Sequence, residues 1–535
     1  MAARQPTGET ATPDRVVEGD LERRLPTLRV ATVAIPVDLA VPAILAVLAL
    51  LVRLSVGPLT IDDAYITFRY ARNLALGHGF VYNVGEQVIG TTTPLYTMVL
   101  ALVYRLGVHD LPSAALTINA LADASTTFVL YGIARKLGFS TLWAGMLALL
   151  FALCPLSIRY AAGGMESSLF TAAVLGALAA DMDDRPALSG WLGGIALLTR
   201  PEGILAVVLI ILRRFIVSRR IPWRTIMPVV VVVLPWLMYA YAWTGSAISQ
   251  SVIAKGSAYH PPWYGMLVEL VHALCVPGLL LDYTHVSFDG WLFDLQMAVL
   301  LLTLIVILHV AVFSGRIRQA LARRPDIWAT VAFGPILTVL YALSGMRRVE
   351  FFPWYLVPLA PCYLLGVVGA LRVVATRVTA APALLGAALF LGWSSYAFNL
   401  TSNRHEAVFA PRGLSQETVN GYRTAAAAVG PLIRPGATVA MKEFGTFGYF
   451  TNAHVLDVDG LISPTARRFY GVMPYQPIPV GLLRQERPEW LVAYDNFCRQ
   501  LQTSAWFQAH YRFVMLVPAP FSTWGARGVL VYRRI

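Results

Sequence analysis

Two stretches near the start of the chain decide its fold: ATVAIPVDLAVPAILAVLALLV at residues 31–52 and IDDAYITFRYARN at residues 61–73. The first stretch is predominantly apolar and, at about 20 residues, is long enough to cross a bilayer as one helix. The second stretch places Asp62 and Asp63 about ten residues beyond the end of that span. Two adjacent carboxylates are therefore expected close to a membrane surface.

The composition extends this expectation to the whole chain. Of the 535 residues, 57% are apolar and 13% are charged, whereas soluble domains are about half apolar and a quarter charged. With a mean hydropathy of +0.61, the chain is predicted to be an integral membrane protein rather than a soluble enzyme, a disordered chain or a collagen-like fibre. The net charge of +12 does not indicate a nucleic-acid partner, because the basic residues gather in short clusters between apolar runs, as in cytoplasmic loops.

Eleven apolar segments predict a mostly α-helical, polytopic transmembrane bundle of about 11 spans. If residues 1–30 form a cytoplasmic N-terminal tail, the basic clusters fall on the cytoplasmic side, as the positive-inside rule requires. The transmembrane domain then covers residues 31–399, with external loops at 53–110 and 244–290. The predicted segments are 31–52, 111–134, 141–158, 167–180, 187–199, 203–212, 225–243, 291–312, 326–344, 352–371 and 381–398.

Three apolar stretches are too short to span a bilayer alone at about 1.5 Å per residue. Residues 187–199 and 203–212 are predicted to form a hairpin with the turn Thr199-Arg200-Pro201-Glu202-Gly203. Charged backbone at membrane depth is tolerated only beside protein or a water-filled cavity, so a cavity is expected at this turn. Residues 94–106 are predicted to form a re-entrant or interfacial helix within the first external loop.

The chain from residue 400 to 535 differs in composition and is predicted to be a small extracytoplasmic α/β domain. It is rich in charge and proline, and its apolar runs are short and alternate as in strands. Strands are predicted at 437–441, 454–458, 490–494, 513–517 and 528–532, and helices at 418–429 and 504–511.

The loop after the first span carries the most informative side chains. Arg69 follows Asp62 and Asp63 at helical spacings, so one interpretation is a capped helix with a solvated face. The other is a sugar site, because Tyr65, His78 and the neighbouring Phe, Asn and Gly residues suit stacking on a sugar and hydrogen bonding to it.

The acidic dyad, the interfacial helix in the same loop, the short hydrophobic helices and the external tail together resemble the GT-C superfamily of polyprenyl-phosphate-sugar-dependent glycosyltransferases. The stretch from Asp62 to Asn73 and the following Gly-rich run are similar to the mycobacterial terminal arabinofuranosyltransferase family. Further matches are Gly163-Gly164-Met165-Glu166-Ser167, Thr199-Arg200-Pro201-Glu202-Gly203, Phe352-Pro353-Trp354-Tyr355 and Gly445-Thr446-Phe447-Gly448-Tyr449.

The resemblance implies an inverting glycosyltransferase that moves a monosaccharide, arabinofuranose in the family that these motifs resemble, from a polyprenyl-phosphate donor to a glycan or glycoconjugate of the cell envelope. Asp62 matches the position of the first-loop general base, with Asp63 as its neighbour in the catalytic dyad. A sugar hydroxyl attacks the anomeric carbon while a carboxylate takes its proton. The phosphate leaving group needs no acid, although cations stabilise it.

Glu166 is expected across the cavity from Asp62, where the resemblance implies that it orients an acceptor or binds a divalent metal. The alternative is an acid at the N-cap of the fourth span. Arg200 and Glu202 form a structural ion pair in one interpretation, and in the other Arg200 faces the donor phosphate.

Four further basic residues lie in predicted external segments, beside aromatic and proline-rich stretches. They are interpreted as a phosphate clamp or as anchors at the membrane interface, where Trp, Tyr and Arg are common. These residues are Lys255, His260, Arg347 and Arg348.

Two alternatives to an enzyme remain at this level: a lipid-linked sugar transporter and a non-catalytic envelope assembly protein. A transporter is expected to show paired hydrophobic halves with broken helices at matching positions, and no internal repeat is evident. The preferred prediction is a multi-pass protein of the plasma (inner) membrane that contacts membrane lipids and has an extracytoplasmic active site.

Overall fold

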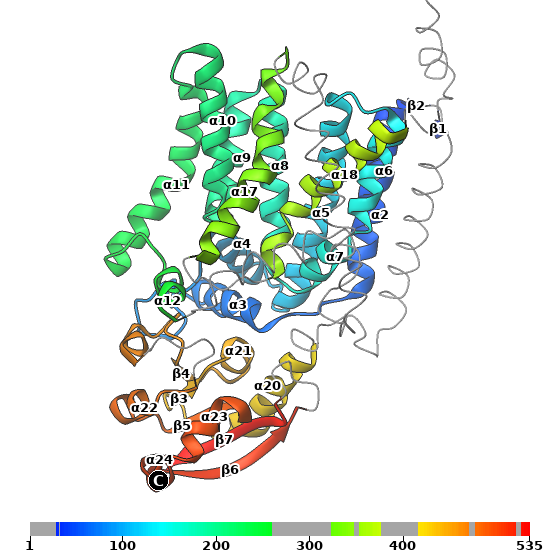
Figure 1. Ribbon diagram of the computed structural model, residues 1–535. Helices are drawn as coiled ribbons and strands as arrows, with labels where there is room; N and C mark the ends of the chain where they lie inside the picture. Colours follow the sequence, from blue (N-terminus) through cyan, green and yellow to red (C-terminus); the bar gives the residue numbers. More distant parts are fainter. Residues whose placement is uncertain are drawn as a thin grey trace, which may run out of the picture.

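The computed structural model describes residues 28–30, 33–258, 323–346, 353–375, 416–469, 477–519 and 526–535. Within these ranges the molecule consists of a bundle of long helices with an α/β domain at one end (Figure 1). The predicted cytoplasmic tail up to residue 27 and the predicted spans at 291–312 and 381–398 lie outside the described residues.

The bundle is built from the apolar segments that the sequence predicts. Nine of them are helical, with the first span starting at Val37 because residues 28–35 form a short hairpin, β1 (Leu28–Val30) with β2 (Val33–Ile35). The helices are α2 (Val37–Val56), α5 (Leu111–Lys136), α6 (Thr141–Ala152), α8 (Ser167–Met182), α9 (Pro186–Thr199), α10 (Gly203–Ser218), α11 (Trp223–Thr244), α17 (Trp328–Met346) and α18 (Leu359–Ala375).

The prediction of eleven spans is not confirmed by helix length. Among the described residues, only α2 and α11 are long and apolar enough to cross a bilayer alone. Helix α6 and the following α7 (Pro155–Ala162) make a third candidate if the pair, bent by 43°, is one span. The predicted segment 141–158 is broken because Pro155 has no N–H to continue the hydrogen-bond ladder of a helix.

A buried ion pair stabilises this break. The Arg53 Nε of α2 donates to Asp123 Oδ2 of α5 at 2.8 Å, and both side chains are fully buried. Arg53 also donates to the carbonyl oxygens of Phe151 and Ala152 in the last turn of α6, where the hydrogen-bond ladder of the helix stops. Asp123, an unexpected acid in a predicted span, is therefore paired.

Short helices form a layer between the bundle and the α/β domain (Figure 1). They are α3 (Asp62–Ala75), α4 (Pro94–Arg105), α7 and α12 (Gln250–Ala258). Helix α4 confirms the short helix predicted at 94–106. At the opposite end of the bundle lie the ion pairs Lys136–Asp183 and Arg214–Asp181, in the loops that the sequence assigns to the cytoplasm.

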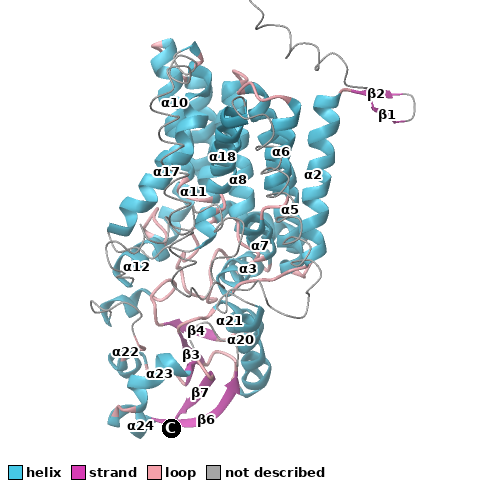
Figure 2. Ribbon diagram, turned by 45° about the vertical axis from the view of Figure 1, so that its right-hand side comes forward, coloured by secondary structure: helices cyan, strands magenta, loops and turns pink. Residues whose placement is uncertain are grey.

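The α/β domain has a five-stranded sheet in the order β4-β3-β5-β7-β6. Strand β3 pairs in parallel with β4 and with β5, and β7 pairs antiparallel with both β5 and β6. Figure 2 shows the sheet at the end of the molecule away from β1 and β2. The strands are β3 (Thr438–Met441), β4 (His454–Asp457), β5 (Trp490–Tyr494), β6 (Tyr511–Pro518) and β7 (Gly528–Arg534).

All five predicted strands are present, and the predicted helices appear as α20 (Gln416–Val429) and α24 (Ala505–His510). Three short helices were not predicted: α21 (Gly445–Thr451), α22 (Val480–Glu486) and α23 (Asp495–Gln502). Helix α21 follows β3 and packs against α3, which connects the α/β domain to the loop that carries the acidic dyad.

Candidate active site beneath the bundle

The acidic dyad is positioned by the backbone just before α3. The Leu59 N–H donates to the Ala162 carbonyl at 2.8 Å, and the Ile61 N–H donates to Gly163 at 3.1 Å. These bonds tie the start of α3 to the turn between α7 and α8. Glu166, which precedes the first residue of α8, is thereby brought to the same region as the dyad.

Asp62 faces the α/β domain and is only 8% exposed. Its Oδ2 accepts from the Gly445 N–H at 2.9 Å and its Oδ1 from the Thr446 N–H at 2.8 Å, so it caps the first turn of α21. Burial raises the pKa of Asp62, and the bonds from Thr446 and Gly445 oppose the rise. The assignment of the general base to Asp62 stays a prediction.

Asp63 lies in different surroundings and is partly exposed. Burial raises the pKa of Asp63 to about 6, since the Lys255 ammonium only partly offsets the loss of water and the carboxylates of Asp62 and Glu166 add to the rise. A carboxylate with this pKa holds a proton more strongly than an ordinary aspartate and is still ionised at neutral pH.

Lys255 of α12 is the cation beside Asp63. Burial alone would lower the pKa of Lys255, but Tyr355 and Asp63 raise it above the ordinary value, so the side chain stays an ammonium. Tyr355 belongs to a short 3-10 helix, η3 (Pro353–Leu356), in the predicted Phe-Pro-Trp-Tyr motif. The other three predicted clamp residues, His260, Arg347 and Arg348, lie outside the described part of the chain.

The predicted ion pair between Arg200 and Glu202 is present and includes a third member. Arg200 donates to Glu166 Oε1 and to Glu202 Oε1, each at 2.8 Å. Its guanidinium also lies 4.7 Å from the Tyr355 ring centroid. Because Arg200 is only 5% exposed and is bonded to two carboxylates, it stabilises the turn between α9 and α10.

The remaining residues of the first loop serve mainly to attach the α/β domain. Arg69 donates to the carbonyl oxygens of Gly448 and Ala453 at 2.8 and 2.7 Å, and the Tyr65 ring lies 5.2 Å from that of Tyr449. The interpretation of α3 as a solvated helix is therefore wrong, because this face of α3 is buried. His78 is exposed, in the turn that follows α3.

The sequence analysis missed the contribution of the β3–α21 connection. Lys442 pairs with Asp459 at 2.7 Å, and burial, with Asp62 and Asp63 close by, raises the pKa of Glu443 well above its usual range. In the sequence, this connection is marked by Gly445. In the structure, a Cβ at this position would collide with the Asp62 carbonyl oxygen. A glycine is required where α21 meets α3.

Among the described residues, no group of three or more His, Cys, Asp or Glu side chains is arranged to hold a metal ion. Asp62 and Glu166 already accept hydrogen bonds from the backbone of α21 and from Arg200, respectively. The divalent metal that the resemblance allows at Glu166 stays a prediction.

Five segments that are far apart in the sequence thus meet at one end of the bundle: the acidic dyad of α3, the turn before α8, the turn between α9 and α10, η3 and α21. A bundle of helices with an acidic first loop packed against a C-terminal α/β domain is the architecture that the resemblance to the GT-C superfamily implies. The described part of the chain has this arrangement.

Comparison with known proteins agrees with this assignment. The crystal structure of ArnT from Cupriavidus metallidurans in the apo state superposes with a TM-score of 0.55 at 14% identity, covering 91% of this chain and 97% of ArnT. ArnT bound to undecaprenyl phosphate gives a TM-score of 0.54 at 13% identity, covering 92% and 97%. At these identities the similarity shows a shared fold.

Another solved structure and one family model are also similar to this chain. The arabinofuranosyltransferase AftD from Mycobacteria has a TM-score of 0.42 at 14% identity, over 92% of this chain and 39% of AftD. A family model described as a domain of unknown function, DUF8728, matches residues 414–532, which cover the α/β domain. No curated protein matches the sequence.

Proposed function

We propose that the protein is an inverting glycosyltransferase that moves a monosaccharide from a polyprenyl-phosphate donor to a glycan or glycoconjugate acceptor at the outer face of the plasma membrane. The proposal rests on one observation above all: Asp63, at the start of α3 where the five segments meet, is a partly exposed carboxylate whose pKa is raised by burial and is lowered in part by the positive charge of Lys255. The GT-C fold supports it, as does the undecaprenyl phosphate bound to the ArnT neighbour.

In this mechanism Asp63 is the proton acceptor and Asp62 is a positioning residue. The acceptor hydroxyl loses its proton to Asp63 as its oxygen bonds to the anomeric carbon. The bond from that carbon to the phosphate oxygen breaks, and polyprenyl phosphate leaves with the electron pair. A single displacement inverts the anomeric configuration.

Asp63 suits this role better than Asp62 for a geometric reason. Both oxygens of Asp62 already accept backbone N–H groups, whereas Asp63 is partly exposed. Among the described cations, Lys255 is proposed to contact the leaving phosphate, because a fixed positive charge stabilises the developing anion. Arg200 would have to leave Glu166 and Glu202 to do the same.

The donor sugar is proposed to be arabinofuranose, on the strength of the sequence motifs. Purified protein in lipid nanodiscs is incubated with a panel of polyprenyl-phosphate sugars and a mixed envelope-glycan acceptor. Mass spectrometry identifies the sugar transferred, and NMR gives its anomeric configuration. Transfer with inversion is expected, and transfer with retention contradicts the single displacement.

The alternative functions predict a different result. A lipid-linked sugar transporter moves the intact donor across the membrane without forming a glycosidic bond, and an assembly protein does neither. Movement of a fluorescent polyprenyl-phosphate sugar across a proteoliposome membrane, without product from any donor, would support the transporter.

A further inference from the structure

A second candidate site lies at the opposite end of the bundle from the α/β domain. An open groove of about 810 Å³ separates the first turns of α9 and α11. Below this groove the two helices are in close contact, since a Cβ on Gly190 would collide with the Thr225 carbonyl oxygen. The groove is lined by Arg185, Pro186, Ala187, Leu188, Trp223, Arg224, Met227 and Pro228.

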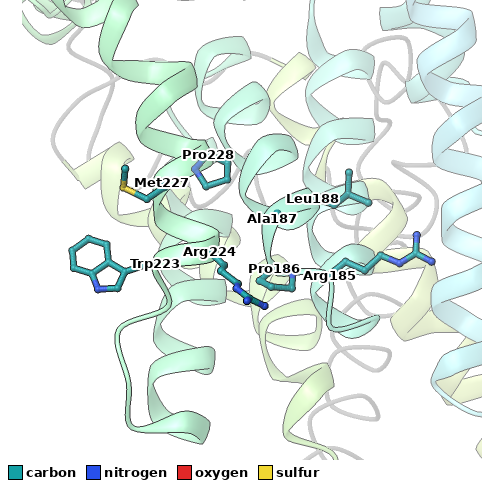
Figure 3. Close-up of a pocket in the computed structure, with 8 residues that line it drawn as sticks. All are labelled: Arg185, Pro186, Ala187, Leu188, Trp223, Arg224, Met227 and Pro228. Atoms are coloured by element: carbon teal, nitrogen blue, oxygen red, sulfur yellow. The ribbon is translucent and has the colours of Figure 1, made fainter.

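Two arginines give this groove its charge. Arg185 precedes α9, and Arg224 lies in the first turn of α11. Figure 3 shows the Arg224 side chain directed toward Pro186, whereas the Arg185 side chain extends from the α9 side away from Arg224. Neither arginine has a carboxylate within 4 Å among the residues that the structure describes.

The neighbouring basic residues behave differently. Arg213 and Arg214 of α10 both pair with Asp181 at 2.6 Å, and Arg214 also pairs with Asp184 at 2.9 Å. The positive charge near the end of α10 is thus compensated within the protein. The charge of the groove is available for a negatively charged ligand.

The walls of the groove are apolar and exposed. Leu188 is 42% exposed, Trp223 58% and Met227 51%. An exposed Trp at the end of a membrane helix is typical of the lipid–water interface. A free anion would neutralise the arginines but leave this apolar surface in water, whereas a phospholipid offers a phosphate to the arginines and acyl chains to the walls.

We propose that this groove binds an anionic glycerophospholipid from the leaflet at the basic end of the bundle. The lipid phosphate is held by Arg224 beside Pro186, Arg185 adds positive charge from the α9 side, and an acyl chain packs against the apolar walls. Neither α9 nor α11 has a side-chain cap on its first turn, so the positive ends of both helix dipoles add to the attraction for the phosphate.

Native mass spectrometry of the full-length protein, released from detergent micelles, tests this proposal. The probes are phosphatidylglycerol, phosphatidylcholine and inorganic phosphate, each titrated separately. We expect phosphatidylglycerol to bind more tightly than phosphatidylcholine. The double variant Arg185→Gln/Arg224→Gln should bind phosphatidylglycerol about 25-fold more weakly, because each cation near a lipid phosphate contributes a factor of about five.

The matched control is Arg219→Gln/Arg220→Gln, which removes the same charge from the same end of the bundle but outside the groove. This control should bind phosphatidylglycerol as the wild type does, and Arg185→Lys/Arg224→Lys should keep most of the binding. Equal losses in the two Gln pairs would mean diffuse charge attraction and overturn the site. Equal binding of phosphatidylglycerol and phosphatidylcholine would also overturn the site. So would saturation of the protein by inorganic phosphate at the concentration at which phosphatidylglycerol saturates it.

Discussion

Asp62 and Asp63 are adjacent in the sequence but have different surroundings, because consecutive residues of a helix project about 100° apart. Asp62 faces α21 of the α/β domain, and Asp63 faces Lys255 of α12. The sequence predicts the dyad and its place after the first span. It does not predict which carboxylate accepts hydrogen bonds from the α/β domain, because the donors to Asp62 lie 383 and 384 residues away.

The pH dependence of transfer is the first residue-level prediction. Because Asp63 must be ionised to accept a proton and its pKa is raised to about 6, kcat/KM should rise with pH through about 6 and level off above it. Lys255→Met removes the cation that lowers this pKa, so the inflection should move to higher pH. An unchanged inflection in Lys255→Met would show that Asp63 does not control the profile.

The buried pair of Arg53 and Asp123 gives a prediction about stability. Asp123→Ala leaves Arg53 charged and buried without its partner, which should lower the free energy of unfolding by about 3–5 kcal/mol. The double variant Arg53→Met/Asp123→Leu removes both charges and should recover most of this loss. Unfolding in detergent measures the free energy of unfolding of both variants. A decrease below about 1 kcal/mol for Asp123→Ala would contradict the role of the pair.

At the level of elements, the helices of the bundle could be predicted from apolar runs, but α21 could not. A seven-residue helix with two glycines is unstable alone. Its N-terminus is capped by Asp62, and the carbonyls near its C-terminus accept from Arg69 and Arg72. This charge arrangement matches the helix dipole, so docking on α3 stabilises α21.

Gly445→Ala tests this docking. The added Cβ collides with the Asp62 carbonyl oxygen, so α21 should separate from α3 and hydrogen exchange should become faster in both helices. Transfer should fall, because Asp62 loses its two donors. Gly132→Ala is the matched control, since a Cβ on Gly132 of α5 has no atom within 4 Å. Unchanged exchange in Gly445→Ala would contradict the account of α21.

At the level of the whole molecule, charge and hydropathy predict which loops share one end of the bundle, and the structure places them together. The number of spans could not be predicted, because α9 and α10 are short and α6 is broken before Pro155. The docking of α21 on the acidic dyad also could not be predicted. It depends on packing between segments that lie 383 residues apart in the sequence.

Membrane sidedness is the corresponding prediction. In a cysteine-free background, a cysteine at Gln502 in the α/β domain should react with an impermeant maleimide in intact cells. A cysteine at Arg220, between α10 and α11, should react only after permeabilisation. Both positions are exposed in the structure, so burial cannot cause a difference in labelling between them. Labelling of both in intact cells would contradict the proposed topology.

The central claim is that Asp63 accepts the proton during sugar transfer, and the most direct measurement is single-turnover transfer by Asp63→Asn. A general base contributes about 10²–10⁴-fold, so transfer should slow by that factor while the donor dissociation constant and the unfolding temperature stay unchanged. Asp62→Asn, the matched neighbour, should lose less activity and show faster exchange in α21. Full transfer by Asp63→Asn, or a comparable loss confined to Asp62→Asn with α21 still docked, would contradict the claim.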